Sequence, residues 1–310
     1  MDLNTALAPI VLFVYNRPEH TRKTLEALSN NTLAAESSLF IFCDGVADSA
    51  SDENRKNNEL VKEVIASKAW CGRVKIITST LNKGLANSVI SGVSQIIKEF
   101  GKVIVLEDDL ITSTRFLEYM NTALTLYENE NKVFQISGFG FNVPNIELGH
   151  NSFFLPLTST WGWGTWSRIW NNADFECKDY DILKLDKELA DKFNFEGSYD
   201  YKKMFIQQME QKKVSSWGIR FYWNAFKNDG LVLYPDNSLV KNIGWDSSGR
   251  HKDDYEVYPM KNWNNSYFIK NYPFEISLDK SIINRTVKYI KIRTSIVTKI
   301  IYKIKLALGL

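Results

Sequence analysis

The sequence predicts an α/β protein with a doubly wound, mainly parallel sheet. Two observations in the first half of the chain lead to this prediction. Short, continuously apolar runs alternate with longer amphipathic runs, as in strands that are buried on both faces and followed by helices. Polar residues come directly after each apolar run, where the carboxyl ends of parallel strands meet at one edge of a sheet.

Four apolar runs are expected to form strands, and a helical pattern follows each of them. Pro18 suits the first turn of the first helix, and the later helices repeat apolar residues three and four positions apart. Thr112 or Ser113 is expected to cap the fourth helix. The expected strands span residues 9–15, 39–43, 74–77 and 103–106.

The pattern changes after about residue 138. Residues 153–157 are expected to form another strand, and amphipathic spacing predicts helices over 184–192, 198–211 and 217–227. The chain therefore divides into three regions, 1–137, 138–274 and a tail, 275–310.

Charge is unevenly distributed along the chain. The formal net charge of +2 does not favour nucleic-acid binding by the chain as a whole. Residues 281–310 hold seven basic and no acidic side chains, so the first 280 residues carry a net charge of −5. The tail also has apolar residues at helical spacing, and a basic amphipathic helix can lie on an anionic membrane surface. The alternative is a terminal helix that packs on the acidic body.

The cysteine spacing and the first residues of the sequence indicate the cellular compartment of the protein. Cys43, Cys71 and Cys177 are too widely spaced for a disulfide framework or a zinc site, which fits a reducing compartment. The sequence begins without a basic, apolar leader, and no stretch reaches the roughly 18 apolar residues of a spanning helix. We therefore expect a cytoplasmic protein, peripheral on the inner face of the membrane if its tail binds lipid.

An acidic triplet, Glu107-Asp108-Asp109, follows the fourth expected strand. Carboxylate oxygens suit Mg²⁺ or Mn²⁺, and such a cation would neutralise a leaving diphosphate. The alternative is a solvated acidic turn facing the next helix N-terminus. Its place at the end of a buried strand, beside three other polar strand ends, favours a metal site.

The other strand ends suit a nucleotide. Asp44 could accept a hydrogen bond from N3–H of uracil or thymine, with Gly45 allowing close approach of the base, or the two could form an ordinary turn. Lys83 could hold phosphate or ribose at a helix start, or Asn82 could simply cap that helix. Arg17 is either a phosphate contact or a surface charge.

Other nucleotide-binding patterns are absent. The turn Asn16-Arg17-Pro18 has no glycine, so the dinucleotide-binding fingerprint is missing there. Gly162-Trp163-Gly164 begins like that fingerprint, but Ser167 stands where its third glycine belongs. No Gly-Lys-Ser/Thr phosphate loop occurs in the sequence.

Taken together, residues 8–251 resemble inverting glycosyltransferases of the GT-A fold. The segment Val105 to Leu110, followed by Phe116 to Tyr119, is especially similar to the N-acetylglucosaminyltransferase I type. The segments 162–166 and 242–251 resemble bacterial sugar transferases of the family 2 type. The resemblance implies a nucleotide-sugar-binding region over 1–137 and an acceptor-binding and catalytic region over 138–274.

The resemblance also implies roles for individual residues. Asp109 is the expected contact for Mn²⁺ or Mg²⁺, and Glu107 or Asp108 is expected to contact ribose. The other donor-binding candidates are Asn16, Arg17, Asp44, Gly45, Asn82 and Lys83. Acceptor contacts are expected from Trp163, Trp217 and Arg220, although clustered tryptophans more often belong to a core.

One position departs from the pattern of these relatives. They place a catalytic Asp directly after a Trp, and Gly218 stands at that position here. The general base is therefore sought in the segment 244–251, which could also close over a donor as a lid. Asp246 is the preferred base, while His251 could act as the base or bind diphosphate or metal.

The sequence thus predicts a metal-dependent hexosyl- or N-acetylhexosaminyltransferase. The donor would be a UDP- or dTDP-sugar and the acceptor a polysaccharide or lipid-linked oligosaccharide, with inversion at the transferred sugar. Two alternatives stay open. A sugar-phosphate nucleotidyltransferase would normally have a glycine-rich, basic loop after its first strand. A non-catalytic glycan-binding relative fits Gly218 but not the intact acidic triplet.

Overall fold

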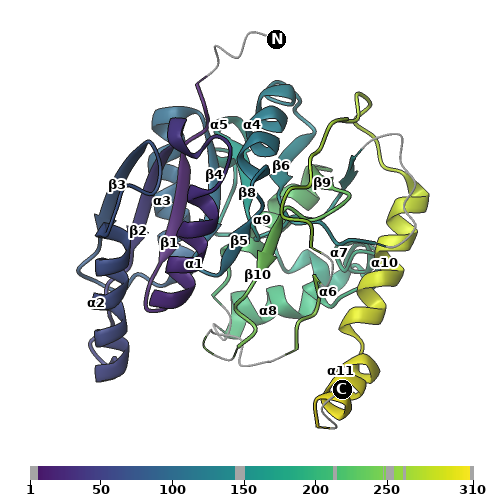
Figure 1. The fold of residues 1–310 in the computed structure, drawn as a ribbon. Coiled ribbons are helices and arrows are strands. Elements are labelled where there is room, and N and C mark those ends of the chain that lie inside the picture. Colours follow the sequence, from purple (N-terminus) through teal and green to yellow (C-terminus); the bar gives the residue numbers. More distant parts are fainter. Residues whose placement is uncertain are drawn as a thin grey trace.

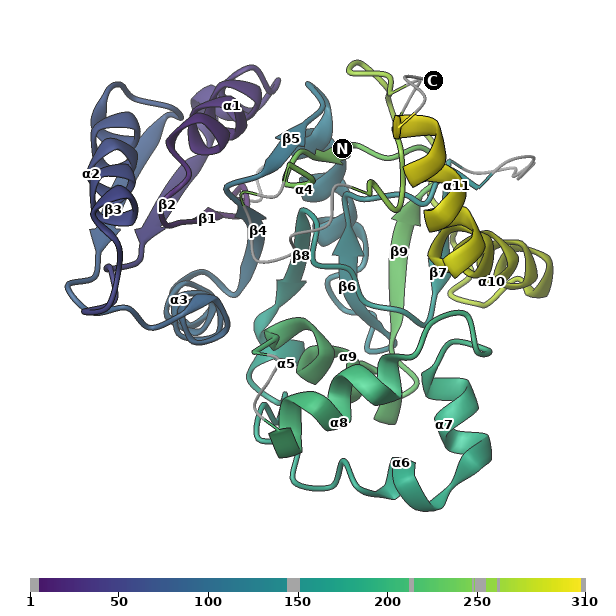
Figure 2. The ribbon, with the colours of Figure 1, turned by 90° about the horizontal axis from the view of Figure 1, so that it is seen from below.

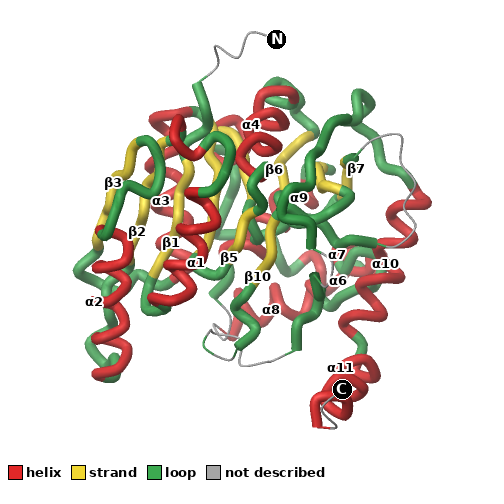
Figure 3. Tube along the Cα trace, in the orientation of Figure 1, coloured by secondary structure: helices red, strands yellow, loops and turns green. Residues whose placement is uncertain are grey.

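The computed structural model describes residues 6–143, 151–211, 215–246, 248, 255–260 and 263–307. An eight-stranded sheet crosses the molecule in the order β3-β2-β1-β4-β8-β6-β9-β7, with helices on both faces (Figures 1 and 3). The expected α/β class with a mainly parallel sheet is therefore confirmed.

The first half of the chain builds the parallel part of this sheet. Strand β1 pairs in parallel with β2 and with β4, and β2 pairs in parallel with β3. Helices α1 and α2 cover one face and α3 covers the other (Figure 2). The elements are β1 (Ile10–Val14), α1 (Pro18–Ser29), the short 3-10 helix Ala34–Glu36, β2 (Ser38–Cys43), α2 (Asp52–Ala66), β3 (Arg73–Thr78), α3 (Leu85–Phe100) and β4 (Lys102–Glu107).

Buried apolar side chains fix the position of the central strand β1 and therefore of the polar residues that follow it. All five residues of β1 are buried, because α1 and α3 cover it from opposite sides. Each such side chain contributes about 1.5–3 kcal/mol when it leaves water. At Gly92 of α3, a Cβ atom would lie 2.8 Å from the ring of Phe13, so α3 rests closely on β1.

The second half of the chain continues the same sheet. Strand β8 (Trp163–Trp166) lies antiparallel between β4 and β6 (Val133–Ser137). Strand β9 (Leu231–Pro235) is parallel to β6, and β7 (Ser152–Leu155) forms the antiparallel edge. Regions 1–137 and 138–274 therefore share one sheet.

A second, two-stranded sheet brings the late part of the chain to the acidic triplet. Strand β5 (Leu110–Thr112) pairs antiparallel with β10 (Val240–Asn242), which the sequence did not predict. The predicted cap of α4 (Phe116–Leu126) is wrong, because Thr112 belongs to β5 and Arg115 holds the cap position. Asn31 instead accepts a hydrogen bond from the Leu117 N–H at 3.0 Å.

Helices α5 to α9, in the described residues 167–227, lie on the side of the sheet that α3 also covers (Figure 2). The helix expected over 184–192 is divided in two, because Asp186 ends the first part and caps the second by accepting a hydrogen bond from Leu189 at 2.9 Å. These helices are α5 (Ser167–Trp170), α6 (Ile182–Leu185), α7 (Lys187–Phe193), α8 (Tyr201–Gln211) and α9 (Trp217–Lys227).

The described part of the tail, residues 275–307, forms two helices that differ in burial. Helix α10 (Lys280–Thr294) packs Ile282, Val287 and Ile290 into the body. Helix α11 (Ile296–Ala307) lies at the margin of the molecule, and its described apolar side chains are largely exposed (Figure 1). In the described ranges, no helix combines the length and the apolar character needed to cross a membrane.

Candidate functional site

Asp44, at the end of β2, fastens the loop that leads into α3. Its carboxylate accepts hydrogen bonds from the backbone N–H groups of Gly45 at 3.1 Å, Lys83 at 3.0 Å and Gly84 at 2.9 Å. The Asn82 side chain donates to the Gly45 carbonyl at 2.7 Å. Four of the eight residues predicted to bind a donor are therefore brought together: Asp44, Gly45, Asn82 and Lys83. Asp44 also has a structural role.

The surroundings of Gly45 and Asn16 modify two of the predictions. A Cβ atom at Gly45 would lie 2.8 Å from the backbone of residues 79–81, so close packing of the loop already accounts for this glycine. The Asn16 side chain donates to the Asn54 side chain at 2.8 Å, which ties it to α2. Neither observation identifies a contact with a base.

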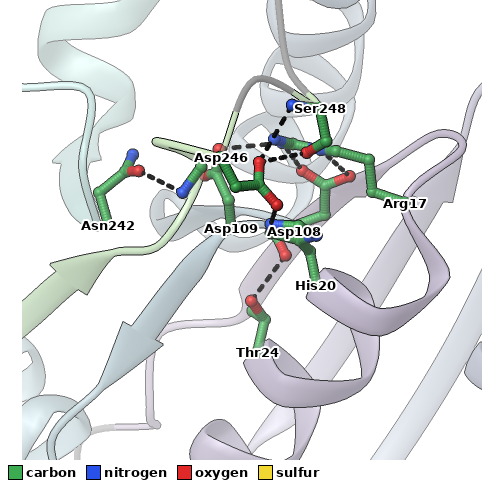
Figure 4. A network of polar contacts seen from close by, with 9 residues as sticks. Arg17, His20, Thr24, Asp108, Asp109, Asn242, Asp246 and Ser248 are labelled. Atoms are coloured by element: carbon green, nitrogen blue, oxygen red, sulfur yellow. Dashed lines mark hydrogen bonds and ion pairs between the residues drawn. The ribbon is translucent and has the colours of Figure 1, made fainter. Parts of the chain in front are cut away.

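Arg17 and the acidic residues after β4 form a second cluster (Figure 4). The guanidinium pairs with Asp108 through two nitrogen atoms and with Asp109 Oδ2 at 2.9 Å. Thr24 donates to the Asp108 carbonyl at 2.8 Å. Burial raises the pKa of Asp108, and the charge of Arg17 opposes that rise. Burial lowers the pKa of Arg17, but the charges of Asp108 and Asp109 outweigh it and raise that pKa overall, so Arg17 stays charged.

The segment after β10 closes over this cluster. The Ile243 N–H donates to the Asp109 carbonyl at 2.9 Å. At Gly244, a Cβ atom would lie 2.3 Å from Asp109 Oδ2, so a larger residue would displace the carboxylate. The close approach therefore requires glycine at this position.

Asp246 follows in the same segment and lies beside His20 (Figure 4). Its Oδ2 is 3.2 Å from His20 Nε2, and its Oδ1 accepts hydrogen bonds from the Ser248 N–H at 3.1 Å and hydroxyl at 2.6 Å. Burial raises the pKa of Asp246, but the hydrogen bonds from Ser248 lower it below its usual value overall. Asp246 is therefore ionised near neutral pH. The other candidate base, His251, lies outside the described residues.

His20 is not among the site residues predicted from the sequence. It stands three positions after Arg17, and Thr24 follows one turn later, so all three lie on the same face of the helix. This helical spacing after Arg17 could have indicated that His20 lies near the site. The facing residue Asp246 is 226 positions away in the chain and could not be inferred from it.

Glu107 has a different environment from its two acidic neighbours. Burial raises its pKa to about 8, the charges of Asp109 and Asp108 add to the rise, and a hydrogen bond from the Trp217 side chain opposes it. Glu107 is therefore mostly protonated near neutral pH.

Replacing Glu107 by glutamine should change how stability depends on pH. Between about pH 4.5 and about pH 8, folded Glu107 keeps a proton that the unfolded chain releases, so the free energy of unfolding falls as pH rises. We expect E107Q to melt above the wild type at about pH 8, with the difference shrinking towards about pH 5. Thermal melts in a chelating buffer measure this. The exposed acid Glu63 provides the control E63Q, and parallel melting curves for E107Q and wild type would contradict the shifted pKa.

The three predicted acceptor contacts all have structural roles. Trp163 is fully buried, and its ring stacks on Trp217 at 4.7 Å and on Trp170 at 5.6 Å. Trp217 is only 3% exposed. Arg220 donates to two backbone carbonyl oxygens, each at 3.2 Å. The prediction that Trp163 and Trp217 contact an acceptor does not hold in this structure, because almost none of their surface is accessible.

An acid at position 218, where the resemblance would place one, would clash with Thr160. A Cβ atom at this position would lie 2.6 Å from Thr160 Cγ2. A carboxylate would therefore require Thr160 to move. The structure gives a steric reason to look for a base elsewhere.

Carboxylate oxygens are suitable ligands for a hard divalent cation, but few of them converge at this site. Asp108 and Asp109 supply oxygen ligands, but Arg17 already contacts both. Within the described part of the chain, no three acidic, histidine or cysteine side chains converge as a metal site. This donor set fits a cation held by one or two carboxylates with ligand phosphates, which is how Mg²⁺ is commonly bound.

No protein-family model matches the chain, and no curated protein sequence does either. Solved structures with a weak likeness include a Pyrobaculum calidifontis mannosyltransferase in complex with GDP-Man and Mn²⁺ (TM-score 0.35, 9% identity, 51% of this chain and 44% of that one). Another is the galactosyltransferase LgtC with donor and acceptor sugar analogues (TM-score 0.37, 12% identity, 70% and 69%). A third is a UDP-glucose pyrophosphorylase with UDP-glucose (TM-score 0.37, 9% identity, 74% and 90%).

The aligned part spans less than half of the mannosyltransferase. At these TM-scores and identities, a likeness does not establish a shared family or activity.

Proposed function

We propose that the protein is a glycosyltransferase that uses a nucleotide-diphosphate sugar, with a glycan as acceptor. The observation that carries this proposal is the cluster at the end of β4, where Arg17, Asp108 and Asp109 lie beneath Asp246. Carboxylates for a cation, a fixed guanidinium for phosphate and an ionised carboxylate for a proton are the groups that such a transfer needs.

Asp109 is the proposed cation contact, and Arg17 the proposed diphosphate contact. Asp109 engages Arg17 through Oδ2, so its other oxygen is the one offered to Mn²⁺ or Mg²⁺. When bound, that cation supplies positive charge beside the diphosphate. Arg17 adds a planar donor group that suits phosphate oxygens.

Asp246 is the proposed general base. The acceptor hydroxyl oxygen would bond to the anomeric carbon, the bond from that carbon to the diphosphate would break, and the hydroxyl proton would pass to Asp246. Attack from the face opposite the leaving group gives inversion. Two features support this role: the half-exposed side chain of Asp246 and its place beside Asp109. The lowered pKa of Asp246 keeps the carboxylate ionised, so it is free of a proton near neutral pH.

A thermal-shift panel of nucleotide sugars tests the proposed function. A ligand that binds only the folded state raises the melting temperature. We expect UDP- or dTDP-sugars to raise it in the presence of Mn²⁺ and to be hydrolysed slowly without acceptor. If no nucleotide sugar shifts the melting temperature with or without Mn²⁺, the proposed function is wrong.

Asp44 is the proposed contact for a uracil or thymine base, and D44A should weaken the binding of such donors. Loss of a hydrogen bond to a charged group costs about 1.5–3 kcal/mol, or roughly 10- to 100-fold in affinity. Binding of UDP-, dTDP- and GDP-sugars by calorimetry gives the comparison.

Because Asp44 also fastens its loop, N82A is the matched control. It removes the loop contact to Gly45 and keeps the carboxylate. N82A should affect every nucleotide alike, whereas D44A should affect pyrimidine nucleotides most. Equal binding of GDP- and UDP-sugars by the wild type would rule out the proposed role of Asp44.

We also propose that α11 contacts an anionic membrane surface, where a lipid-linked acceptor would be found. Four of its apolar residues are 49–75% exposed, and the helix carries three lysines and no acid. Each basic residue near such a surface contributes about 1 kcal/mol. The exposed apolar residues are Ile296, Val297, Ile300 and Ile301.

Removing α11 alone should release the protein from anionic liposomes. Truncation after Ser295 keeps α10, whose buried side chains belong to the body, so the fold and donor hydrolysis should persist. Co-sedimentation with phosphatidylserine and phosphatidylcholine liposomes measures the effect, and high salt should reproduce part of it. A full-length protein that ignores anionic liposomes at low salt would show that α11 has another role.

A further inference from the structure

A cavity of about 340 Å³ lies between the start of α9 and the loop 157–161. Its volume is within the range of about 300–1,000 Å³ typical of small-molecule sites. Trp161 lines the cavity and meets Trp245 edge to face, with ring centroids 5.9 Å apart. Because Trp245 directly follows Gly244, which packs against Asp109, the cavity adjoins the proposed site of transfer.

The tyrosines that line this cavity fall into two groups. Tyr222 and Tyr234 donate to backbone carbonyl oxygens, at 2.9 Å and 2.8 Å, and are satisfied within the protein. The hydroxyl groups of Tyr199, Tyr201 and Tyr258 have no hydrogen-bond partner among the described residues. A cavity lined by three tyrosines with such hydroxyls suits a ligand that presents hydroxyl groups of its own.

Trp161 offers an aromatic surface in the same cavity. It is partly exposed, and its contacts with Phe139, Trp245 and Tyr258 are all edge to face, at interplanar angles of 81°, 78° and 71°. In the described part of the chain, no ring stacks parallel to it. The C–H face of a sugar ring packs well on such an apolar surface.

The cavity also selects against charge. Among the described residues that line it, none has an ionisable acid, lysine, arginine or histidine side chain. Gly218 is one of the lining residues, and an acid there would meet Thr160 and add a charge. Placing a charged ligand in such a cavity would leave that charge uncompensated.

We propose that this cavity binds an uncharged pyranose ring of the acceptor, with its apolar face on Trp161 and its hydroxyls on Tyr201 and Tyr258. This inference rests on the proposed function, because the acceptor role follows from the adjacent site of transfer. It replaces Trp163 and Trp217, which are buried, as the place where the acceptor is recognised. It also accounts for Gly218, because a glycine at this position adds neither bulk nor charge to the cavity.

The test uses the full chain, the double variant Y201F/Y258F and the control Y180F. Both changes remove hydroxyls and keep the rings, so the fold should persist. Tyr180 bonds to Glu210 and does not line the cavity. Saturation-transfer NMR with a panel of methyl gluco-, galacto-, manno- and N-acetylglucosaminide pyranosides measures binding without a donor, and methyl glucuronide is the charged comparison.

We expect at least one uncharged pyranoside to bind the wild type and Y180F alike. Its affinity should fall by about 3- to 10-fold for each lost hydroxyl contact in Y201F/Y258F. Equal binding by wild type and double variant, absence of binding for every uncharged pyranoside, or tighter binding of the glucuronide would each overturn the proposal.

The donor thermal shift is recorded for the same three proteins. It should be unchanged in Y201F/Y258F. If the donor raises the melting temperature of all three proteins but pyranoside binding is the same in Y201F/Y258F as in the wild type, only the proposed role of the cavity is wrong. A missing shift in the wild type overturns the proposed function instead.

Discussion

Replacing Asp109 by alanine is expected to lower sugar transfer by about 10³-fold or more while leaving the fold intact. A cation at a leaving diphosphate supplies several kcal/mol, and each 1.36 kcal/mol corresponds to about tenfold in rate. The fold should persist because Arg17 keeps its contact with Asp108, and because removing one of two adjacent carboxylates relieves their repulsion. Transfer rate with Mn²⁺ and melting temperature together give the result.

The variant D109N and chelation with EDTA distinguish loss of a cation ligand from loss of the contact between Asp109 and Arg17. The variant D109N can still accept a hydrogen bond from Arg17 but provides a poor ligand for a hard cation, so it should be nearly as inactive as D109A. D191A, which removes an exposed acid on α7, should behave as the wild type. Chelation with EDTA should inactivate the wild type, and full activity in EDTA would show that Asp109 does not act through a cation.

Replacing Asp246 by asparagine should lower turnover far more than donor affinity. Loss of a general base typically costs about 10²- to 10⁴-fold in rate. Asparagine has nearly the same shape and can still accept the hydrogen bonds from Ser248, so the segment over Asp109 should keep its place. Single-turnover rates measure the effect on the chemical step, and donor dissociation constants measure the effect on affinity.

His20 and Ser248 provide variants that distinguish a base from a residue that only positions the loop. H20A removes the facing group and keeps the carboxylate, so it should cost less turnover than D246N. S248A removes a hydrogen bond that lowers the pKa of Asp246, so the acidic limb of the rate profile should move to higher pH. Near-wild-type turnover of D246N would move the role of base to His251 or another group.

The strand ends show how far inference from the sequence reaches. Asp44, Asp109 and Arg17 were expected at one edge because parallel strands present their carboxyl ends together, and the parallel pairing of β1 with β2 and β4 confirms this. Their division into two hydrogen-bonded clusters was not predictable. It depends on where the start of α3 meets Asp44 and where α1 presents Arg17 to the acidic residues.

The tryptophans show the opposite case. The run 161–166 is compatible with a sugar-binding surface and with a core strand, and the core is the commoner role of clustered aromatic side chains. Insertion of β8 between β4 and β6 buries Trp163, while Trp161, two residues earlier, remains at the cavity. The sequence contains the aromatic side chains but not the strand order that separates their roles.

Local pattern alone determined the α/β class and the four strand-helix units, because the spacing of apolar residues records which faces of a segment are buried. Only the tertiary structure decided which distant segments meet. Pairing of β5 with β10 carries Asp246 to Asp109. Packing divides the tail into α10, which buries one apolar face in the body, and α11, whose described apolar side chains are largely exposed. Contacts between segments far apart in the chain arise from the packing of whole elements, and no local spacing encodes them.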